Sequence, residues 1–254
     1  MISTLRFSGK MESYIRYRPG YPRRLIDFLY AEHGFTRESV IADIGSGTGV
    51  FSRLLLERGS RVVGIEPDDT MREASERLLS DEFTRYVTIS GTAEFTSLPN
   101  MSVNHIVCAQ SFHHFDYEKC KAEFSRILKP GGSIILIWNR PCFNSNPFLE
   151  NLAPILSRYC AEVEDLALCK LTPAYFTDFF GSCCFSVLSV PNQQILDFEG
   201  IKGRFLVDCG IPEPGQDGYE EMIGEIKTLF DIYNTSGKII VSYETEAYAG
   251  KPVL

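Results

Sequence analysis

The stretch Val40-Ile41-Ala42-Asp43-Ile44-Gly45-Ser46-Gly47-Thr48-Gly49 decides the fold of this chain. Its mostly apolar first half predicts a buried strand, and its three glycines predict a tight turn. A helix with Phe51, Leu54 and Leu55 on one face follows and ends at Gly59, a typical C-terminal cap. A strand, a glycine turn and a helix in this order indicate the first unit of a parallel α/β sheet.

The same alternation continues to Arg140. Asp68 or Asp69 caps the second helix, because a short carboxylate satisfies first-turn amides. The run Lys129-Pro130-Gly131-Gly132 ends the last helix of this half. We expect strands at Arg61–Glu66, Tyr86–Ile89, Val103–Gln110 and Ile134–Trp138, and helices from 68 to 79 and from 117 to 128. Apolar strands separated by single helices predict a doubly wound, mostly parallel sheet, which binds ligands beyond the carboxyl ends of its strands.

After Arg140 the alternation lapses, and helical patterns predominate. We expect helices at Phe148–Cys160, Pro173–Phe180, Ile201–Val207 and Tyr219–Tyr233, and strands at Phe185–Val190 and Lys238–Tyr248. The chain shows no linker rich in Pro, Gly or Ser, so we predict one domain over residues 1–254. Residues 1–35 form an arm and a helix, 36–140 the ligand-binding half, and 141–182 and 199–236 a helical insertion over the ligand edge.

Composition narrows the function. The 254 residues include 25 Lys and Arg against 33 Asp and Glu, a net charge of -8, which disfavours nucleic acids and anionic membranes as partners. We see neither a signal peptide nor a transmembrane stretch. The eight cysteines contain no C-x-x-C pair, so we expect reduced core thiols, no metal site and a cytoplasmic protein.

The glycine turn is a candidate ligand site. Alternatively, the glycines are present only because the turn requires positive φ angles. Helix amides at such a turn favour anionic groups, and a carboxylate at Glu66 can accept hydrogen bonds from both hydroxyls of a ribose. In the dinucleotide pattern G-x-G-x-x-G the third glycine would stand at Val50, but Gly49 comes one residue early. Asp43 would repel a pyrophosphate and attract an amino group or a sulfonium. The sequence therefore favours S-adenosylmethionine over NAD.

Several motifs strengthen this interpretation. They are Asp43-x-Gly45-x-Gly47-x-Gly49, Glu66-Pro67, Gly91-Thr92-Ala93-Glu94 with Leu98-Pro99, residues 109–116 (AQSFHHFD), and Arg126-x-Leu128-Lys129-Pro130-Gly131-Gly132. Together they resemble class I S-adenosylmethionine-dependent methyltransferases, and among these the small-molecule branch called methyltransferase type 11. The resemblance covers most of residues 14–140 and implies a seven-stranded Rossmann-like methyltransferase fold.

The resemblance also implies a set of binding residues. Asp43, Gly45 and Gly47 would line the methionine portion of the cofactor, and Glu66 would hold the ribose. The others would be Met71 on the adenine, Thr92 and Ala93 at its polar edge, Gln110 near the sulfur, and Arg18 at the methionine carboxylate. Relatives often carry aspartate where Thr92 stands, and Met71 on a helical face is otherwise an ordinary core residue.

A sulfonium methyl is already activated, so the enzyme mainly aligns the nucleophile and excludes water. A general base is needed only for an acceptor that is protonated at neutral pH, and His113 is our candidate. His114, Tyr14 and Tyr17 are candidates for the acceptor site, together with residues 141–171 and 201–218. Alternatively, the histidines only hold their loop, and residues 14–22 form a surface arm.

We therefore predict methyl transfer to a small-molecule acceptor. One alternative is a non-enzymatic S-adenosylmethionine-binding or regulatory protein that kept the fold. Another is a nucleic-acid methyltransferase, but Gln110-Ser111-Phe112-His113 stands where base-methylating enzymes carry Asn-Pro-Pro-Tyr.

Overall fold

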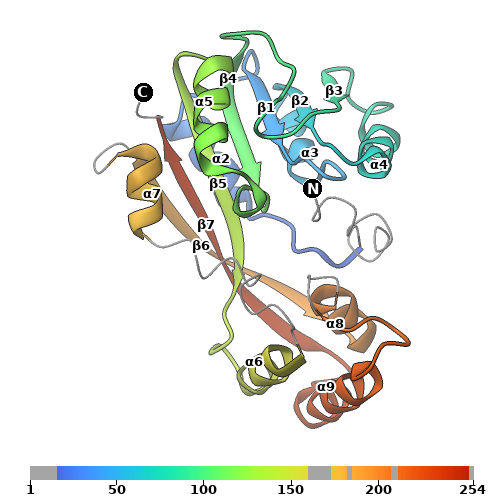
Figure 1. The fold of residues 1–254 in the computed structure, drawn as a ribbon. Helices are drawn as coiled ribbons and strands as arrows, with labels where there is room; N and C mark the ends of the chain where they lie inside the picture. Colours follow the sequence, from blue (N-terminus) through green and yellow to red (C-terminus); the bar gives the residue numbers. More distant parts are fainter. Residues whose placement is uncertain (1–15, 160–172, 182–184, 207–210, 252–254) are drawn as a thin grey trace.

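The computed structural model describes residues 16–159, 173–181, 185–206 and 211–251. Its centre is a seven-stranded sheet of order β3-β2-β1-β4-β5-β7-β6 (Figure 1). The strands are β1 (Val40–Ile44), β2 (Arg61–Ile65), β3 (Tyr86–Ile89), β4 (Val103–Ala109), β5 (Leu128–Pro141), β6 (Phe185–Leu196) and β7 (Ile239–Gly250). The first five pair in parallel, and β7 runs antiparallel to both β5 and β6. The predicted doubly wound, mostly parallel, Rossmann-like sheet is confirmed.

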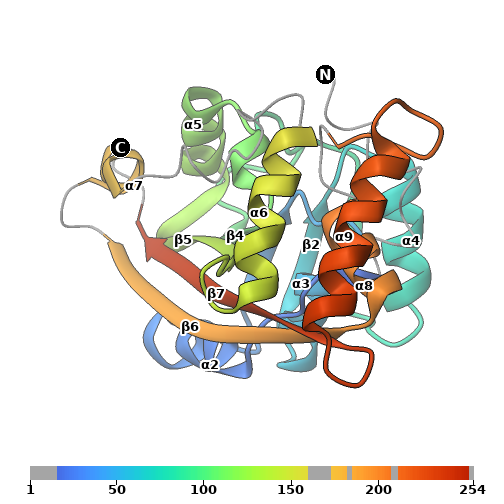
Figure 2. The same ribbon diagram turned by 90° about the horizontal axis from the view of Figure 1, so that it is seen from below.

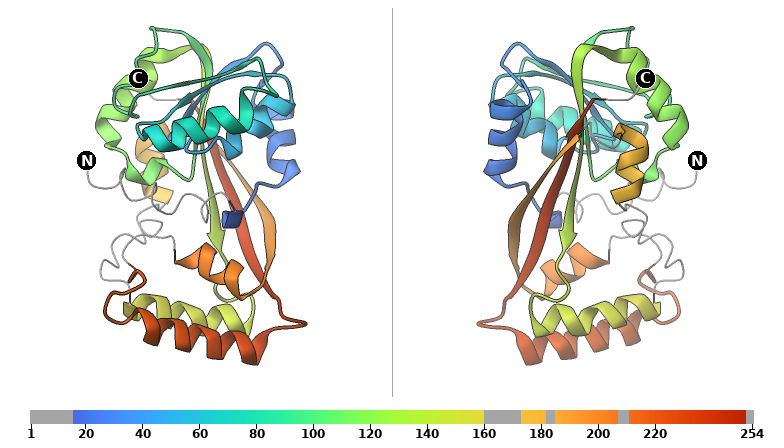
Figure 3. Two further views of the ribbon diagram at one scale, coloured as in Figure 1. Left: turned by 90° about the vertical axis from the view of Figure 1, so that its right-hand side faces the viewer. Right: turned by 90° about the vertical axis from the view of Figure 1, so that its left-hand side faces the viewer.

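Helices cover both faces of this sheet (Figure 3). One face carries α2 (Arg23–Glu32), α3 (Val50–Glu57) and α4 (Asp69–Leu79); the other carries α5 (Tyr117–Ile127) and α7 (Pro173–Phe180). Side chains of β5 alternate between the two cores: Ile135 and Ile137 pack with α2 and α3, whereas Leu136 and Trp138 pack with α5 and α7. The central strands β1, β2 and β4 and most of β5 are buried on both faces, which explains their continuous apolar runs.

A third apolar cluster lies at the far ends of β6 and β7, beyond the carboxyl ends of the parallel strands. It packs α6 (Pro147–Tyr159), α8 (Phe198–Phe205) and α9 (Tyr219–Tyr233) against the two long strands (Figure 2). Phe148, Ile201 and Ile226 are among its almost fully buried members. These helices fall largely within the two predicted insertions. None of the helices that the structure describes has the length and apolarity needed to cross a bilayer.

Of the boundaries that differ from the sequence-based expectations, three have a clear physical reason. β5 begins at Leu128, directly after α5, because Leu128 pairs with Val103; the register then shifts, so that His105 pairs with Ser133. β6 runs six residues past Val190, because its polar second half pairs with the backbone of β7. α8 begins at Phe198 and not at Ile201, because the Asp197 side chain accepts a hydrogen bond from the backbone N–H of Gly200 at 2.8 Å. Cys160 and Val207, two predicted helix ends, lie outside the described residues.

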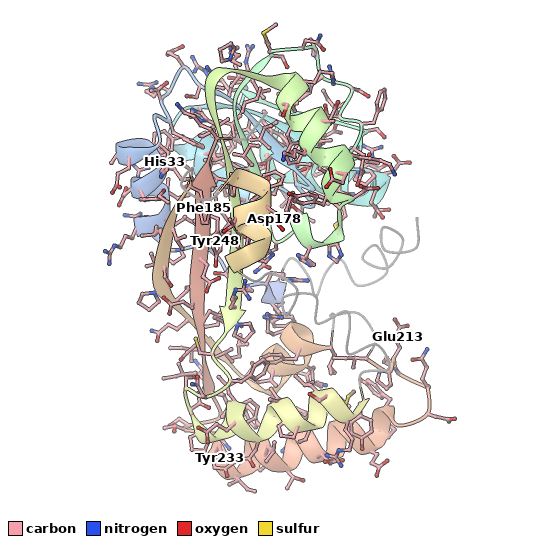
Figure 4. All side chains as sticks on the ribbon, turned by 60° about the vertical axis from the view of Figure 1, so that its left-hand side comes forward. His33, Asp178, Phe185, Glu213, Tyr233 and Tyr248 are labelled. Atoms are coloured by element: carbon pink, nitrogen blue, oxygen red, sulfur yellow. The ribbon has the colours of Figure 1, made fainter. Side chains whose placement is uncertain are left out.

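Aromatic side chains fix α7 to the sheet. Phe176 stacks on Tyr248 of β7, with ring centroids 3.6 Å apart and an interplanar angle of 10°. Phe180 lies 5.4 Å from Phe185 of β6, and Figure 4 shows Phe185 and Tyr248 beside this helix. Trp138 meets Phe176 edge-on at 5.7 Å and is fully buried. The end of β5 is therefore held by rigid aromatic contacts.

His105 of β4 makes the fold sensitive to acid. Its ring stacks on Phe35 at 3.9 Å, its Nδ1 lies 2.8 Å from Oγ of Ser133, and it is 6% exposed. Burial lowers its pKa from 6.5 to about 4, so the unfolded chain binds a proton at a higher pH than the folded protein does. The free energy of unfolding should therefore fall as the pH drops from 6.5 towards 4.

Urea unfolding of His105→Gln across this pH range tests whether His105 causes this loss of stability. The variant should be less stable at neutral pH, and its free energy of unfolding should fall less steeply as the pH drops. His114→Gln, which replaces an exposed histidine, should retain the wild-type dependence on pH. A His105→Gln slope equal to that of the wild type would contradict this linkage.

Candidate active site

The three glycines of the turn after β1 have a left-handed backbone. φ is +68° at Gly45, +54° at Gly47 and +81° at Gly49, a region that residues with a side chain rarely adopt. A Cβ atom on Gly45 would lie 2.6 Å from Cβ of Ser111, and one on Gly49 would lie 2.5 Å from Cδ1 of Leu79. The turn is thus pressed between the segment after β4 and helix α4, so two of its glycines are required by packing within the protein.

Glu66 directly follows β2 and ties it to the turn. Its Oε2 accepts a hydrogen bond from the backbone N–H of Gly47 at 2.9 Å, and its Oε1 accepts one from Asp68 at 3.0 Å. The residue is 8% exposed; burial raises its pKa, and the two backbone hydrogen bonds lower it in part. Each carboxylate oxygen can accept more than one hydrogen bond, so Glu66 retains capacity for hydroxyl groups of a ligand.

Asp43, the last polar residue of β1, is buried within the protein. It is 1% exposed, and its Oδ2 accepts a hydrogen bond from Oγ of Ser52 in α3 at 2.6 Å. Burial, the largest cause, and the charge of Glu66 raise its pKa to about 7, although hydrogen bonds from Ser52 lower it in part. Its carboxyl group therefore supports the turn through α3, and its predicted contact with a methionine moiety stays a prediction.

The residues predicted around an adenine follow β2 and β3. Met71 and Ala93 are each 3% exposed, Met71 in the first turn of α4 and Ala93 within the core beneath α5. Thr92 is exposed and exchanges two backbone hydrogen bonds with Phe95, at 3.1 and 3.2 Å. The topology brings these residues to the same end of the sheet as Glu66.

Gln110 ends β4 in a conformation that the sequence does not reveal. Its φ is +58°, in the left-handed region, and its side-chain Nε2 donates a hydrogen bond to the carbonyl oxygen of Asn139 at 3.2 Å. The next residue, Ser111, donates from Oγ to the carbonyl oxygen of Ile44 at 2.7 Å. Backbone strain in a residue other than glycine concentrates at functional sites. The end of β4 is therefore bound to the ends of both β1 and β5.

His113 lies in the short 3-10 turn η3 (Phe112–His114) and contacts β5. Nε1 of Trp138 donates a hydrogen bond to its Nδ1 at 3.2 Å. Burial, the largest cause, and the neighbouring His114, Arg18 and Arg140 together lower the pKa of His113 to about 3. The His114 side chain is exposed, with its ring 3.9 Å from that of His113. Trp138 and Arg140 were not among the predicted site residues, although the change from apolar to polar at the end of β5 was a usable signal.

The N-terminal arm, residues 16–22, is fixed by amide side chains of the long strands. Nδ2 of Asn139 lies 3.2 Å from the carbonyl oxygen of Gly20, which also accepts a hydrogen bond from Asn192 at 2.8 Å. Gln194 donates to the carbonyl oxygen of Tyr17 at 3.1 Å. These contacts hold the segment that carries Tyr17 and Arg18 against the long strands. The predicted contacts of Tyr17 and Arg18 with ligands stay predictions, and Tyr14 lies outside the described residues.

Known proteins resemble this chain in sequence. Residues 42–136 match the family model of a methyltransferase domain, Methyltransf_11. A methyltransferase-like protein of Schizosaccharomyces pombe, C25B8.10, is 26% identical over 250 residues, which cover 96% of this chain and 94% of that protein. The Mycobacterium tuberculosis methyltransferase Rv3342 is 34% identical over 136 residues, 54% of this chain and 53% of that one.

A solved structure shares the fold. The S-adenosylmethionine-dependent methyltransferase of Geobacter sulfurreducens, determined with S-adenosyl-L-homocysteine, superposes with a TM-score of 0.56 at 14% identity and covers 98% of both chains. Sheet order and sequence match together define a methyltransferase. Residues 42–136 form a methyltransferase domain of type 11, and the chain is an S-adenosylmethionine-dependent methyltransferase.

Two helical glycines test how the arm is held. A Cβ atom on Gly203 of α8 would lie 1.9 Å from Cδ2 of Tyr17, whereas one on Gly224 of α9 would meet nothing within 4 Å. Gly203→Ala should displace Tyr17 and accelerate hydrogen exchange across residues 17–20. Gly224→Ala should leave exchange there unchanged and stabilise its helix by up to about 1 kcal/mol. Equal exchange in the two variants would contradict the packing of Tyr17 on α8.

Proposed function

We propose that this methyltransferase transfers the methyl group of S-adenosylmethionine to a small-molecule acceptor. The supporting observation is the carboxylate of Glu66, held beside the glycine turn by the N–H of Gly47 at 2.9 Å. A fixed, nearly buried acceptor group at this position fits the two hydroxyls of a ribose. Residues 36–140 would hold the cofactor, and residues 141–182 and 199–236 would cover the acceptor.

The residues present fit this cofactor. Thr48 in the turn is 2% exposed, and its Oγ1 has no hydrogen-bond partner among the residues that the structure describes. A buried hydroxyl without a partner is costly unless a ligand or water pairs with it. The other proposed contacts are Gly45 and Gly47 along the methionine moiety with Asp43 behind them, Met71, Thr92 and Ala93 around the adenine, Gln110 near the sulfur, and Arg18 at the carboxylate.

The acceptor would lie between the strand ends and the helices beyond them. The arm passes through this region in Figure 1 and carries Tyr17 and Arg18, while η3 contributes His113 and His114. Protein on both sides of the site favours a small acceptor over a duplex or a protein surface. The net charge of -8 also disfavours a nucleic acid.

Catalysis by this chain would consist mainly of alignment. S-adenosylmethionine, when bound, supplies an activated methyl group. The glycine turn and Glu66 would fix the nucleoside. Gln110, with its strained backbone, would hold the end of β4 beside the sulfur, and the N-terminal arm would exclude water. In-line placement of the two reactants supplies much of the rate acceleration in such reactions.

A labelling experiment tests the acceptor class. The full chain is incubated with methyl-labelled S-adenosylmethionine and either the small-molecule or the macromolecular fraction of a cell extract. We expect label and S-adenosylhomocysteine to form with the small-molecule fraction. Labelling of macromolecules alone would overturn the proposal in favour of a nucleic-acid or protein acceptor, and no turnover with either fraction would favour a binding protein.

Glu66→Ala tests the ribose contact. Hydrogen bonds to a charged group contribute about 1.5–3 kcal/mol, so calorimetry should show S-adenosylhomocysteine binding weakened by roughly 10- to 150-fold. Glu82→Ala, which removes an exposed carboxylate paired with Arg53, is the control and should bind normally. An unchanged dissociation constant in a folded Glu66→Ala protein would exclude Glu66 from the site.

A further inference from the structure

We propose that Trp138 holds His113 in the neutral tautomer with its hydrogen on Nε2, so that His113 is a fixed hydrogen-bond donor to the methyl acceptor and not a base. The tautomer follows from contacts within the chain. The donor role rests on the proposed function, which places the acceptor beside η3.

The direction of the hydrogen bond decides the tautomer. An indole nitrogen can only donate, so Nδ1 of His113, 3.2 Å from Nε1 of Trp138, must offer its lone pair. In neutral imidazole the other nitrogen, Nε2, then carries the hydrogen. Among the described residues Nε2 makes no hydrogen bond, and the half-buried ring leaves it for a ligand.

Protonation of His113 would break this arrangement. A hydrogen on Nδ1 would face the N–H of Trp138, and a fully buried indole would lose its acceptor. Trp138 cannot easily turn away, because Phe176 and Tyr248 meet its ring edge-on at 5.7 and 6.2 Å. Trp138 is therefore a positioning residue for His113.

The charges around His113 act in the same direction. Arg18 of the arm, Arg140 of β5 and His114 of η3 all lower its pKa, after burial as the largest cause. The acid nearby is Glu246 of β7, whose Oε2 accepts a hydrogen bond from Nε of Arg140 at 2.6 Å. His113 is consequently neutral at physiological pH.

The neutral Nε2–H form of His113 restricts which methyl acceptors can react. Its nucleophilic atom needs a free lone pair at neutral pH, because His113 has no lone pair with which to remove a proton. That lone pair forms the bond to the methyl carbon, and the electron pair of the broken carbon–sulfur bond stays on sulfur. A second, oxygen-bearing group of the acceptor would accept the hydrogen bond from Nε2–H.

NMR of the imidazole nitrogens in the full chain, saturated with S-adenosylhomocysteine, tests the tautomer. His113 should show the Nε2–H form throughout about pH 5 to 8 and should not titrate there. Trp138→Phe, which keeps a buried ring and removes the donor, should raise the pKa of His113 and leave cofactor affinity unchanged. The Nδ1–H form, or titration of wild-type His113 between about pH 6 and 7, would overturn the proposal.

Two small ions test the donor role in the same complex. The acetate ion accepts hydrogen bonds, and the methylammonium ion only donates them; the chloride concentration is the same in all samples. Acetate should shift the Nε2–H resonance of His113, and methylammonium should not. No shift with acetate, or a shift with methylammonium alone, would overturn the donor role. Failure of the proposed function would give a different result, because S-adenosylhomocysteine would then not bind, even before either ion is added.

Discussion

The hydrogen bond from the backbone N–H of Gly47 to the carboxylate of Glu66 joins the ends of the first two strands. The rest of the ligand edge depends on the turn that this bond fixes. Ser111 fastens the segment after β4 to the carbonyl oxygen of Ile44, and Leu79 of α4 packs where Gly49 lacks a side chain. Four secondary-structure elements thus converge on a turn that only glycine can form. A substitution in this turn would disturb packing and binding together.

A second constraint comes from buried amide groups at the far ends of the long strands. Asn139 is 1% exposed, and its Oδ1 accepts hydrogen bonds from Thr245 at 2.5 Å and from Asn192 at 3.2 Å. Its amide nitrogen lies within hydrogen-bond distance of the arm. Since buried polar groups need partners, this network specifies where the arm crosses the sheet. The polar end of β6 therefore helps to position the N-terminal arm beside the site.

The sequence predicted the sheet well because its signals are local. Apolar strands, a glycine turn and the capping residue Asp68 identify their elements within a few neighbours, and Asp68 does accept a hydrogen bond from the N–H of Met71. The length of β6 could not be predicted, because the polar run Asn192-Gln193-Gln194 interrupts its apolar pattern and is part of a strand only by pairing with β7. Asp43 shows the limit for the site: the sequence did not reveal that its side chain accepts a hydrogen bond from Ser52, and its contact with a ligand stays a prediction.

The bond between Trp138 and His113 was equally beyond sequence analysis. It joins residues 25 positions apart and depends on the register of β4 against β5 and on the turn η3. The motif alone offered an imidazole as a base; the partner of its Nδ1 makes that imidazole a donor.

A crystal structure of the complex with S-adenosylhomocysteine would show whether Glu66 binds the ribose. We expect the ribose hydroxyls within hydrogen-bond distance of Glu66, with the sulfur beside Gln110. A nucleoside bound elsewhere, with Glu66 bonded only to Gly47 and Asp68, would contradict it.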